Sequence, residues 1–334
     1  LIECPMHEIQ YNLYKRLSEN DILSQNEETD PMSSKAIQNS NITYPDEKLE
    51  INSIIKTVNI QTVGSGKSKV KTKYVYKNPD ERFFSLQNIR KYSSKINRIG
   101  DYILNSKGIS FIYSFFIKAG LTPIQLMLEE MGFNQYDILG KNNNLLGSTS
   151  PNICYVLPDG RIEIRNRSQS PPENGMRATY VLLKGEDDTS TMTTNQSFDS
   201  IQVANRPENK NGQIIKVILG SRVAGEGLDF KNIRDIHILE PWYNLSRIDQ
   251  AVGRAIRNCS HIDLPFSEKG VEKLSPAPPK IKLYEVYDGY DFPKNSPYGF
   301  CGALTKYLRK KYGVINFNSF IVGIKSIYEE HNVQ

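Results

Sequence analysis

Short apolar runs that alternate with helical segments are the feature of this chain that most restricts its fold. Their apolar residues are mostly consecutive, which is typical of strands that are buried on both faces of a sheet. Strands that alternate with helices in this way predict a parallel α/β sheet with helices packed on its faces. The expected strands are 109–113, 180–183, 214–219, 235–239 and 281–286.

The helices expected between these strands have recognisable ends. Pro123 suits the first turn of a helix, because its ring fixes φ and its missing N–H needs no partner there. Gly132 is placed to end the same helix. The expected helices are 94–104, 122–131 and 246–256, followed by a basic helix at 303–312 and a further one at 317–328.

Three regions are expected along the chain. Residues 1–95 form an irregular, polar N-terminal segment with a polar insert, in which 6–17 has helical spacing. The α/β domain spans 96–290 and is interrupted by an insertion at about 139–178, where Pro158-Asp159-Gly160 predicts the turn of a β-hairpin. A C-terminal helical extension covers 291–334.

Composition excludes several classes of protein. With 38% hydrophobic and 24% charged residues among 334, the chain is expected to be globular rather than disordered. No apolar run reaches the roughly 18 residues of a membrane span, and there is no signal peptide, so neither membrane insertion nor secretion is expected. The net charge of +5 permits an anionic partner without requiring one. Because the first residue is Leu1 rather than Met, we expect the sequence to be part of a longer polypeptide.

The four cysteines are scattered, so they form no disulfide framework and are expected to be reduced thiols in a cytosolic or nuclear-type compartment. Pooling Cys4 and His7 with Cys259 and His261 would give four ligands, but nothing in the sequence brings the two pairs together. No metal site is therefore predicted.

The segment 218–260 carries most of the residues that suggest chemistry. Gly225 and Gly227 follow an expected strand, where a glycine-rich loop lets the backbone approach a phosphate. After one more expected strand come Arg254 and Arg257, which are three apart and so share a face of a helix. Two guanidinium groups suit a triphosphate, because each can bind phosphate oxygens with two hydrogen bonds. An isolated pair of arginines would more often be a solvated helix face, so the combination with the loop is the informative feature.

These motifs together resemble those of the second RecA-like domain of superfamily 2 helicases. Residues 111–114 are similar to motif IV, 221–230 to motif V and 250–257 to motif VI, while 240–244 is similar to a segment of Swi/Snf-like translocases. The sequence also resembles helicase-like ATPases of large cytoplasmic DNA viruses, of the poxvirus early transcription factor small subunit and nucleoside triphosphatase I type. The segments 41–45, 92–95 and 259–261 fit that group as well.

The resemblance implies an α/β, RecA-like parallel sheet and a set of nucleotide contacts. Arg254 and Arg257 would contact the γ-phosphate of ATP, and Gln250 would couple this lobe to an N-terminal RecA-like lobe of the same polypeptide. That other lobe would hold most of the Mg-ATP. The residues implied to line the nucleotide cleft are Gly225, Gly227, Asp229 and Gly253. For Asp229, a loop or capping carboxylate is the alternative.

The resemblance also implies contacts with a DNA or RNA phosphate backbone. These would be made by Ser114, by Ser221 and by the backbone of Arg222. Local hydrogen bonds to the backbone are an equally good explanation for the two serines. Trp242 and Tyr243 would either stack on bases or pack in the interior.

The function that follows is the C-terminal lobe of an ATP-dependent helicase or translocase in viral transcription or DNA metabolism. RNA polymerase or other viral transcription proteins would be further partners, and the expected location is the cytoplasm, in a viral factory or a virion. The alternative is a transcription initiation or termination factor subunit that does not unwind and uses the lobe mainly for DNA binding and docking.

The segment Gly64-Ser65-Gly66-Lys67-Ser68 looks like a nucleotide-binding Walker A loop but lacks its context. Gln61 stands where the motif needs its first glycine, and 69–76 alternates like an exposed strand where a helix is required. A flexible basic loop is the better interpretation, although a stand-alone nucleotide-binding enzyme that uses Lys67 is a third alternative. Without this motif, and without an Asp-Glu-x-His acidic motif, the chain alone is expected to be inactive.

Overall fold

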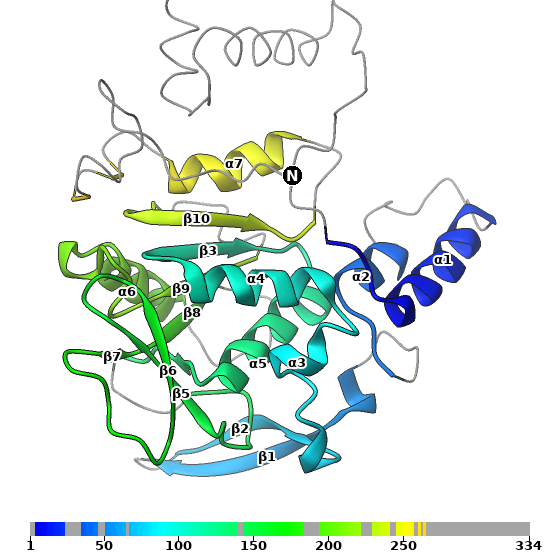
Figure 1. Cartoon of the computed structure of the whole chain (residues 1–334), viewed down its shortest axis with the longest axis horizontal. Coiled ribbons are helices and arrows are strands. Elements are labelled where there is room, and N and C mark those ends of the chain that lie inside the picture. Colours follow the sequence, from blue (N-terminus) through cyan, green and yellow to red (C-terminus); the bar gives the residue numbers. More distant parts are fainter. Residues whose placement is uncertain are drawn as a thin grey trace, which may run out of the picture.

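A five-stranded parallel sheet with helices on both faces is the centre of the molecule (Figure 1). The computed structural model describes residues 4–23, 35–45, 51–64, 67–138, 143–183, 194–221, 229–240, 245–256, 260–261 and 263–264. The strand order is β10-β3-β9-β8-β4, and every neighbouring pair is parallel. The strands are β3 (Ile109–Tyr113), β4 (Asn134–Gln135), β8 (Thr179–Leu183), β9 (Val217–Gly220) and β10 (Ile233–Ile238).

This sheet confirms the predicted α/β class. The strands expected at 109–113, 180–183 and 235–239 are present, and the one expected at 214–219 begins later, at Val217. The start moves because the backbone N–H groups of Ile214 and Ile215 both donate to the side-chain oxygen of Asn209, at 2.8 and 2.9 Å, instead of to a neighbouring strand. The strand expected at 281–286 lies outside the described residues.

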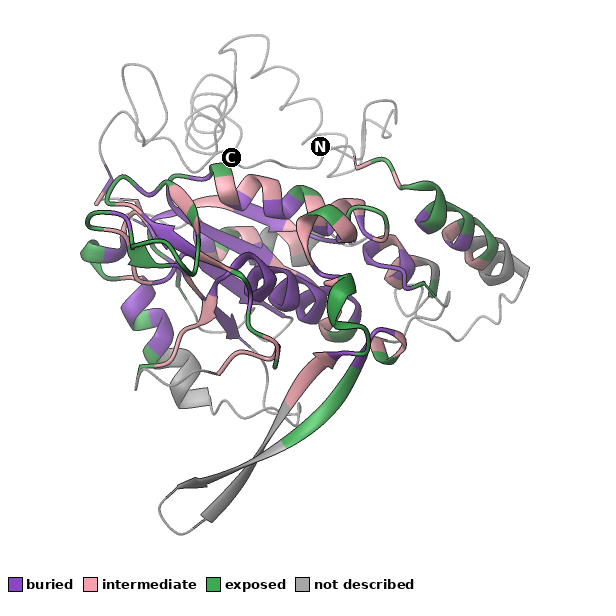
Figure 2. Ribbon diagram, turned by 60° about the horizontal axis from the view of Figure 1, so that its bottom comes forward, coloured by how far each residue is buried: buried purple, intermediate pink, exposed green. Residues whose placement is uncertain are grey.

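Successive residues of each strand enter two different hydrophobic cores, one on each face of the sheet, as the two-residue period of a strand requires. Ile112 and Leu182 pack in the core that α4 and α5 cover, whereas Phe111 and Val181 pack in the core that α6 and α7 cover. Figure 2 shows these strands coloured as buried between the helices. The four helices are α4 (Ser94–Asn105), α5 (Thr122–Met131), α6 (Thr194–Ala204) and α7 (Leu245–Ala255).

Helix α5 is fully buried, and its end depends on one glycine. A π-helical turn at Ile117–Leu121 precedes it, so the helical run begins before the predicted start at Thr122-Pro123. At the other end Gly132 has φ +103°, in the left-handed region that favours glycine, which confirms the predicted stop. A Cβ at this position would lie 2.6 Å from the backbone oxygen of Asn152.

Replacing Gly132 by alanine is therefore expected to lower the free energy of unfolding by about 2 kcal/mol, because of the positive φ and the backbone clash. The matched control is Gly253→Ala in α7, where a Cβ would meet nothing within 4 Å. That change is expected to be neutral or to stabilise by up to about 1 kcal/mol, since alanine favours helix. Urea denaturation of both variants measures the difference in the free energy of unfolding. Equal effects of the two changes would contradict the requirement for a glycine at position 132.

The N-terminal segment is more regular than its polar composition predicts. Its described part contains a helix pair, a long hairpin and a short helix, and Ile42, Tyr44 and Phe84 from this segment are buried in the core beside α5. The expectation of mostly loops fails here because burial of a few apolar residues outweighs weak local preferences. The elements are α1 (Glu8–Leu23), α2 (Lys35–Asn41), β1 (Ile55–Gly64), β2 (Lys67–Tyr76) and α3 (Leu86–Ile89).

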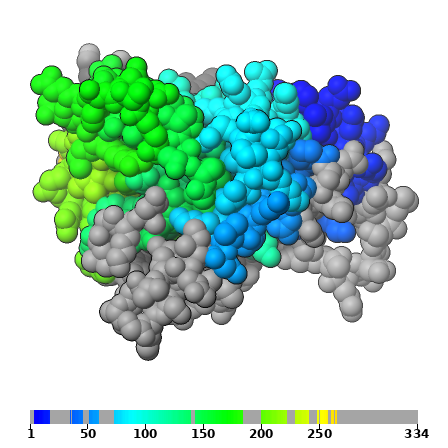
Figure 3. Space-filling model, turned by 90° about the horizontal axis from the view of Figure 1, so that it is seen from below, coloured from blue at the N-terminus to red at the C-terminus, as the bar shows by residue number. Residues whose placement is uncertain are grey.

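The insertion forms a second small sheet beside the end of β2. Its hairpin of β5 (Asn152–Val156) and β6 (Ile162–Asn166) confirms the predicted turn, with Gly160 at φ +84°. A third strand, β7 (Met176–Arg177), pairs with β5. The backbone of Tyr74 in β2 bonds to residues on either side of Leu146, with an N···O distance of 2.8 Å to Leu145. In Figure 3 this green insertion and the cyan segment that follows β2 share one continuous surface.

The expectations for the C-terminal end of the chain fall on residues outside this description. The helices expected at 303–312 and 317–328, and with them the C-terminal extension 291–334, are not among the described residues. Within the part of the chain that is described, no helix has the length and apolar character needed to cross a membrane. The described residues also contain no group of three or more potential metal ligands.

Candidate nucleotide-binding and nucleic-acid-binding sites

Helix α7 carries the predicted nucleotide contacts on its outer side. Ala251 and Ala255 are buried against the sheet, whereas Gln250 and Gly253 are exposed and Arg254 lies partly buried beside them. The spacing i, i+3, i+4 places these three on one side of the helix. The helix expected at 246–256 is confirmed as α7.

The C-terminal end of α7 lies against the segment that contains Asp229. The backbone N–H of Phe230 donates to the carbonyl oxygen of Arg254 at 3.1 Å, so Asp229 and Arg254 are close in the fold. Asp229 is exposed, and Asn205 at the end of α6 donates to its backbone carbonyl at 2.7 Å. These hydrogen bonds to backbone carbonyls hold the segment at Asp229 beside the ends of α6 and α7. The other predicted residues of this region, Arg222, Gly225, Gly227 and Arg257, lie outside the described residues.

Gly253 has no described neighbour that requires a glycine. It is exposed in the middle of a helix, where glycine is about 1 kcal/mol less favourable than alanine. A Cβ added at Gly253 would meet nothing within 4 Å, so packing within the described part of the fold does not require a glycine here.

The two serines predicted to contact nucleic acid lie side by side at the carboxyl edge of the sheet. Ser114 follows β3 and Ser221 follows β9, and the backbone N–H of Ser114 donates to the carbonyl of Gly220 at 3.2 Å. Both serines are buried. The Ser114 hydroxyl donates to Glu240 at 2.6 Å and that of Ser221 is 3.4 Å from the carbonyl of Leu183. In this arrangement both hydroxyls form hydrogen bonds within the protein. This is closer to the alternative explanation for the two serines, local hydrogen bonds, than to direct contact with nucleic acid.

Glu240 is a buried carboxylate at this edge that sequence reasoning did not assign. It follows β10, is 3% exposed, and also accepts from the backbone N–H of Phe115 at 2.9 Å. Burial raises the pKa of Glu240, while the hydrogen bonds from Ser114 and Phe115 and the charge of Lys95 oppose this shift. An acidic residue directly after a strand of a parallel sheet was the signal that could have identified it.

The Walker A-like segment lies where the two strands of a β-hairpin, β1 and β2, meet in the sequence. Gly64 ends β1, Lys67 begins β2, and the two residues are paired in an antiparallel ladder. A phosphate-binding loop needs a helix after it, so this context does not support a nucleotide site at Lys67.

His261, one of the four ligands considered for a metal, is bonded within the protein through both ring nitrogens. They lie 2.7 Å from the hydroxyl of Ser260 and 2.8 Å from the carbonyl oxygen of Ile233. This histidine therefore packs the start of β10 against the residues that follow α7.

Comparison with known families matches part of this fold. A family model described as the helicase conserved C-terminal domain matches residues 179–259. This part of the chain is therefore similar to a helicase C-terminal domain. The match begins at β8 and includes α6, β9, β10 and α7, whereas β3, which lies between β9 and β10 in the sheet, precedes it in the sequence.

The relatives of this chain include proteins of large DNA viruses, as the sequence resemblance implied. A protein of Acanthamoeba polyphaga mimivirus named as an ATP-dependent RNA helicase is 30% identical over 199 residues, which are 55% of this chain and 17% of that protein. A second such mimivirus protein is 29% identical over 230 residues, covering 69% and 33%. The termination factor NPH-I homolog of African swine fever virus is 31% identical over 184 residues, covering 54% and 25%. The chain thus spans a third or less of the length of these relatives.

Proposed function

We propose that this chain is the C-terminal lobe of an ATP-dependent helicase or translocase that acts on a nucleic-acid phosphate backbone. The observation that carries the proposal is the outer side of α7, where Gln250, Gly253 and Arg254 are presented next to Asp229. The helicase domain match and the viral relatives named as ATP-dependent helicases support the same conclusion.

In this proposal Arg254, together with Arg257, neutralises the charge that develops on the γ-phosphate during hydrolysis. Gln250 contacts the partner lobe, and Gly253 allows that lobe or the nucleotide to approach the helix. The ATP and its Mg²⁺ are held mainly by an N-terminal RecA-like lobe of the same polypeptide. This chain supplies no metal ligands in the proposal and contributes cationic groups and positioning.

The nucleic acid is proposed to lie across the carboxyl edge of the sheet, over the loops that follow β3 and β9. Because the hydroxyls of Ser114 and Ser221 bond internally, backbone groups of these loops and of Arg222 are better candidates for phosphate contacts. One relative is named as an RNA helicase, which makes RNA a candidate substrate, and DNA is the other candidate because both have the phosphate backbone that the proposal requires. As a virus-type enzyme it would act in cytoplasmic viral factories or virions.

We expect ATP turnover only when this chain is part of the longer polypeptide. In this proposal the groups that hold Mg-ATP belong to the N-terminal lobe, so the chain alone should hydrolyse no ATP. The longer protein should hydrolyse ATP faster in the presence of single-stranded DNA or RNA. Lys67→Ala in the longer protein should leave turnover unchanged, since Lys67 begins a strand. Phosphate-release assays measure turnover by the chain alone, by the longer protein and by its Lys67→Ala variant. Loss of activity in the Lys67 variant would instead support a nucleotide site in the hairpin.

A second candidate function, a transcription factor subunit that does not unwind, is favoured by the termination factor homolog among the relatives. Strand-displacement assays distinguish the two. Separation of a duplex that depends on ATP supports a helicase, whereas ATP turnover without separation, combined with retention on a viral RNA polymerase, supports the termination or initiation role.

A further inference from the structure

Four segments that are far apart in the sequence meet in one polar cluster at the carboxyl edge of the sheet. We call it the edge cluster, and it consists of Asn41, Ser93, Lys95, Ser114 and Glu240. Each residue belongs to a segment that the sequence singled out, yet the nucleotide contacts on α7 involve none of them. Lys95 is partly buried and the other four are buried.

Asn41 connects a cation to an anion inside this cluster. Its side-chain oxygen accepts from Lys95 Nζ at 3.1 Å, and its amide nitrogen donates to Glu240 Oε1. The Ser93 hydroxyl donates to the backbone carbonyl of Asn41 and accepts from the N–H of Ile96 at 3.1 Å, so it also caps α4. The N-terminal segment and α4 are thereby fixed to the carboxylate that follows β10.

Glu240 in turn holds the loop that follows β3. Ser114 donates to one carboxylate oxygen at 2.6 Å and the N–H of Phe115 donates to the other at 2.9 Å. Gly120 lies close to this hydrogen bond, since a Cβ there would be 2.0 Å from Ser114 Oγ and 3.4 Å from Glu240 Oε1. The Ser114–Glu240 contact is therefore tightly packed, and two hydrogen bonds hold the loop to Glu240.

The position of Glu240 in the chain gives this contact a consequence. The residues immediately after Glu240 lead into α7, which carries Gln250 and Arg254. The carboxylate that holds the loop next to the proposed nucleic-acid path thus belongs to a residue shortly before Leu245 in the sequence, where the arginine helix begins.

We propose that Glu240 is a positioning residue that couples nucleic-acid binding at the 114–116 loop to the placement of Arg254 on α7. The inference rests on the proposed function, since it names how the two sites of that function communicate. In this role Glu240 touches neither ATP nor nucleic acid. Displacement of the loop by a bound strand moves the carboxylate, and α7, which begins shortly after Glu240 in the sequence, is displaced in turn.

The test is Glu240→Gln in the longer polypeptide. The glutamine amide has the size of the carboxylate but has a donor in place of one acceptor oxygen. Asn41, Ser114 and Phe115 all donate to Glu240, so at least one of these hydrogen bonds is lost together with the charge. We expect basal ATP turnover close to the wild-type rate and a loss of about tenfold in the stimulation by single-stranded nucleic acid. Lys95→Gln, which removes the opposite charge, should reduce the stimulation in the same direction and provides the test if Glu240→Gln does not fold.

A stability-matched control separates positioning from simple stabilisation. Arg82→Met breaks a buried ion pair elsewhere in the domain and should lower basal and stimulated rates together, leaving their ratio unchanged. A wild-type ratio in the Glu240 variant, or a parallel fall of both rates as in the Arg82 variant, would overturn the inference.

Hydrogen exchange provides a readout that does not depend on turnover. In the Glu240 variant, peptides that cover 114–118 and 245–256 should exchange faster, whereas those that cover α5 should not. Unchanged exchange in 245–256 would overturn the positioning role whatever the ATPase assay shows. If the wild-type protein shows no ATP turnover at all, the proposed function fails, and the exchange data still decide whether Glu240 links the loop to α7.

Discussion

Replacing Arg254 by alanine in the longer polypeptide is expected to lower ATP turnover by a factor of about 10³ or more, the range observed for arginines that stabilise phosphoryl transfer. Lysine should not restore the rate, because a single ammonium group cannot reproduce the two parallel hydrogen bonds of a guanidinium. Nucleic-acid affinity should stay at the wild-type value, since Arg254 lies near Asp229 and away from the carboxyl edge where Ser114 and Ser221 meet. Turnover under saturating ATP and fluorescence anisotropy with a labelled single strand measure the two quantities.

The matched control for this change is Arg161→Ala. Arg161 is an exposed arginine of the insertion, with a side chain that is 65% exposed and paired to Asp159, so its loss removes the same charge without affecting α7. Wild-type turnover in the Arg254 variant would refute the transition-state role. An equal loss in both variants would show that the effect comes from overall charge.

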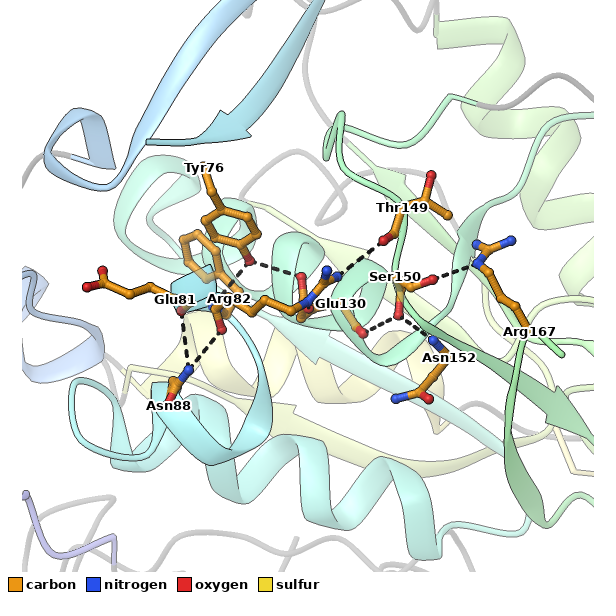
Figure 4. Close-up of polar contacts among 10 residues, drawn as sticks. Tyr76, Glu81, Arg82, Asn88, Glu130, Thr149, Ser150, Asn152 and Arg167 are labelled. Atoms are coloured by element: carbon orange, nitrogen blue, oxygen red, sulfur yellow. Dashed lines mark hydrogen bonds and ion pairs between the residues drawn. The ribbon is translucent and has the colours of Figure 1, made fainter. Parts of the chain in front are cut away.

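Arg82→Met is expected to lower the free energy of unfolding by about 3 kcal/mol, because it leaves a buried carboxylate without its cation. Arg82 pairs with Glu130, which lies at the end of α5 and has a side chain that is only 2% exposed. Tyr76 donates to the same carboxylate at 3.0 Å (Figure 4). Burial, followed by the charge of Glu130, raises the pKa of Tyr76, so its hydroxyl remains a donor. Thermal or urea denaturation measures the effect.

Two comparisons make the Arg82 result interpretable. Adding Glu130→Gln to Arg82→Met should recover part of the lost stability, since the unpaired charge disappears while an acceptor for Tyr76 remains. Arg161→Met, which breaks an exposed ion pair, should change stability by less than about 1 kcal/mol. If Arg82→Met were no more destabilising than Arg161→Met, the buried pair would not stabilise the junction of α5 with the hairpin.

Much of the sheet could be predicted from the sequence, because strands buried on both faces are nearly continuous apolar runs. Residues 109–113 and 180–183 are of this kind and appear as β3 and β8. Helix α6 could not be predicted in this way, since it begins with Thr, Asn, Gln and Ser, which give little helical signal without the packing of Ile201 and Ala204 against the sheet. Local preference is weak in such segments, and contacts made elsewhere in the chain decide their structure.

Of the candidate site, the helix that carries Arg254 could be predicted, but the polar contacts at the carboxyl edge could not. The spacing of Gln250, Gly253 and Arg254 on a helix follows from the sequence, and α7 has that geometry. The direction of the Ser114 hydroxyl could not be inferred, because its partner Glu240 is remote in sequence and becomes a neighbour only when β3 and β10 pair. Buried polar partners of this type depend on tertiary structure, and no spacing rule along the chain identifies them.

The place of β3 between β10 and β9 in the sheet has a consequence for how the protein is made. During synthesis β3 emerges early, but Ser110 finds its partner Val217 and Ile109 finds Ile233 only after the insertion and α6 have been produced. Until then an apolar strand has both of its edges unpaired, which is the condition under which nascent chains aggregate or recruit chaperones. Expression of this lobe should therefore be sensitive to the rate of translation through the insertion.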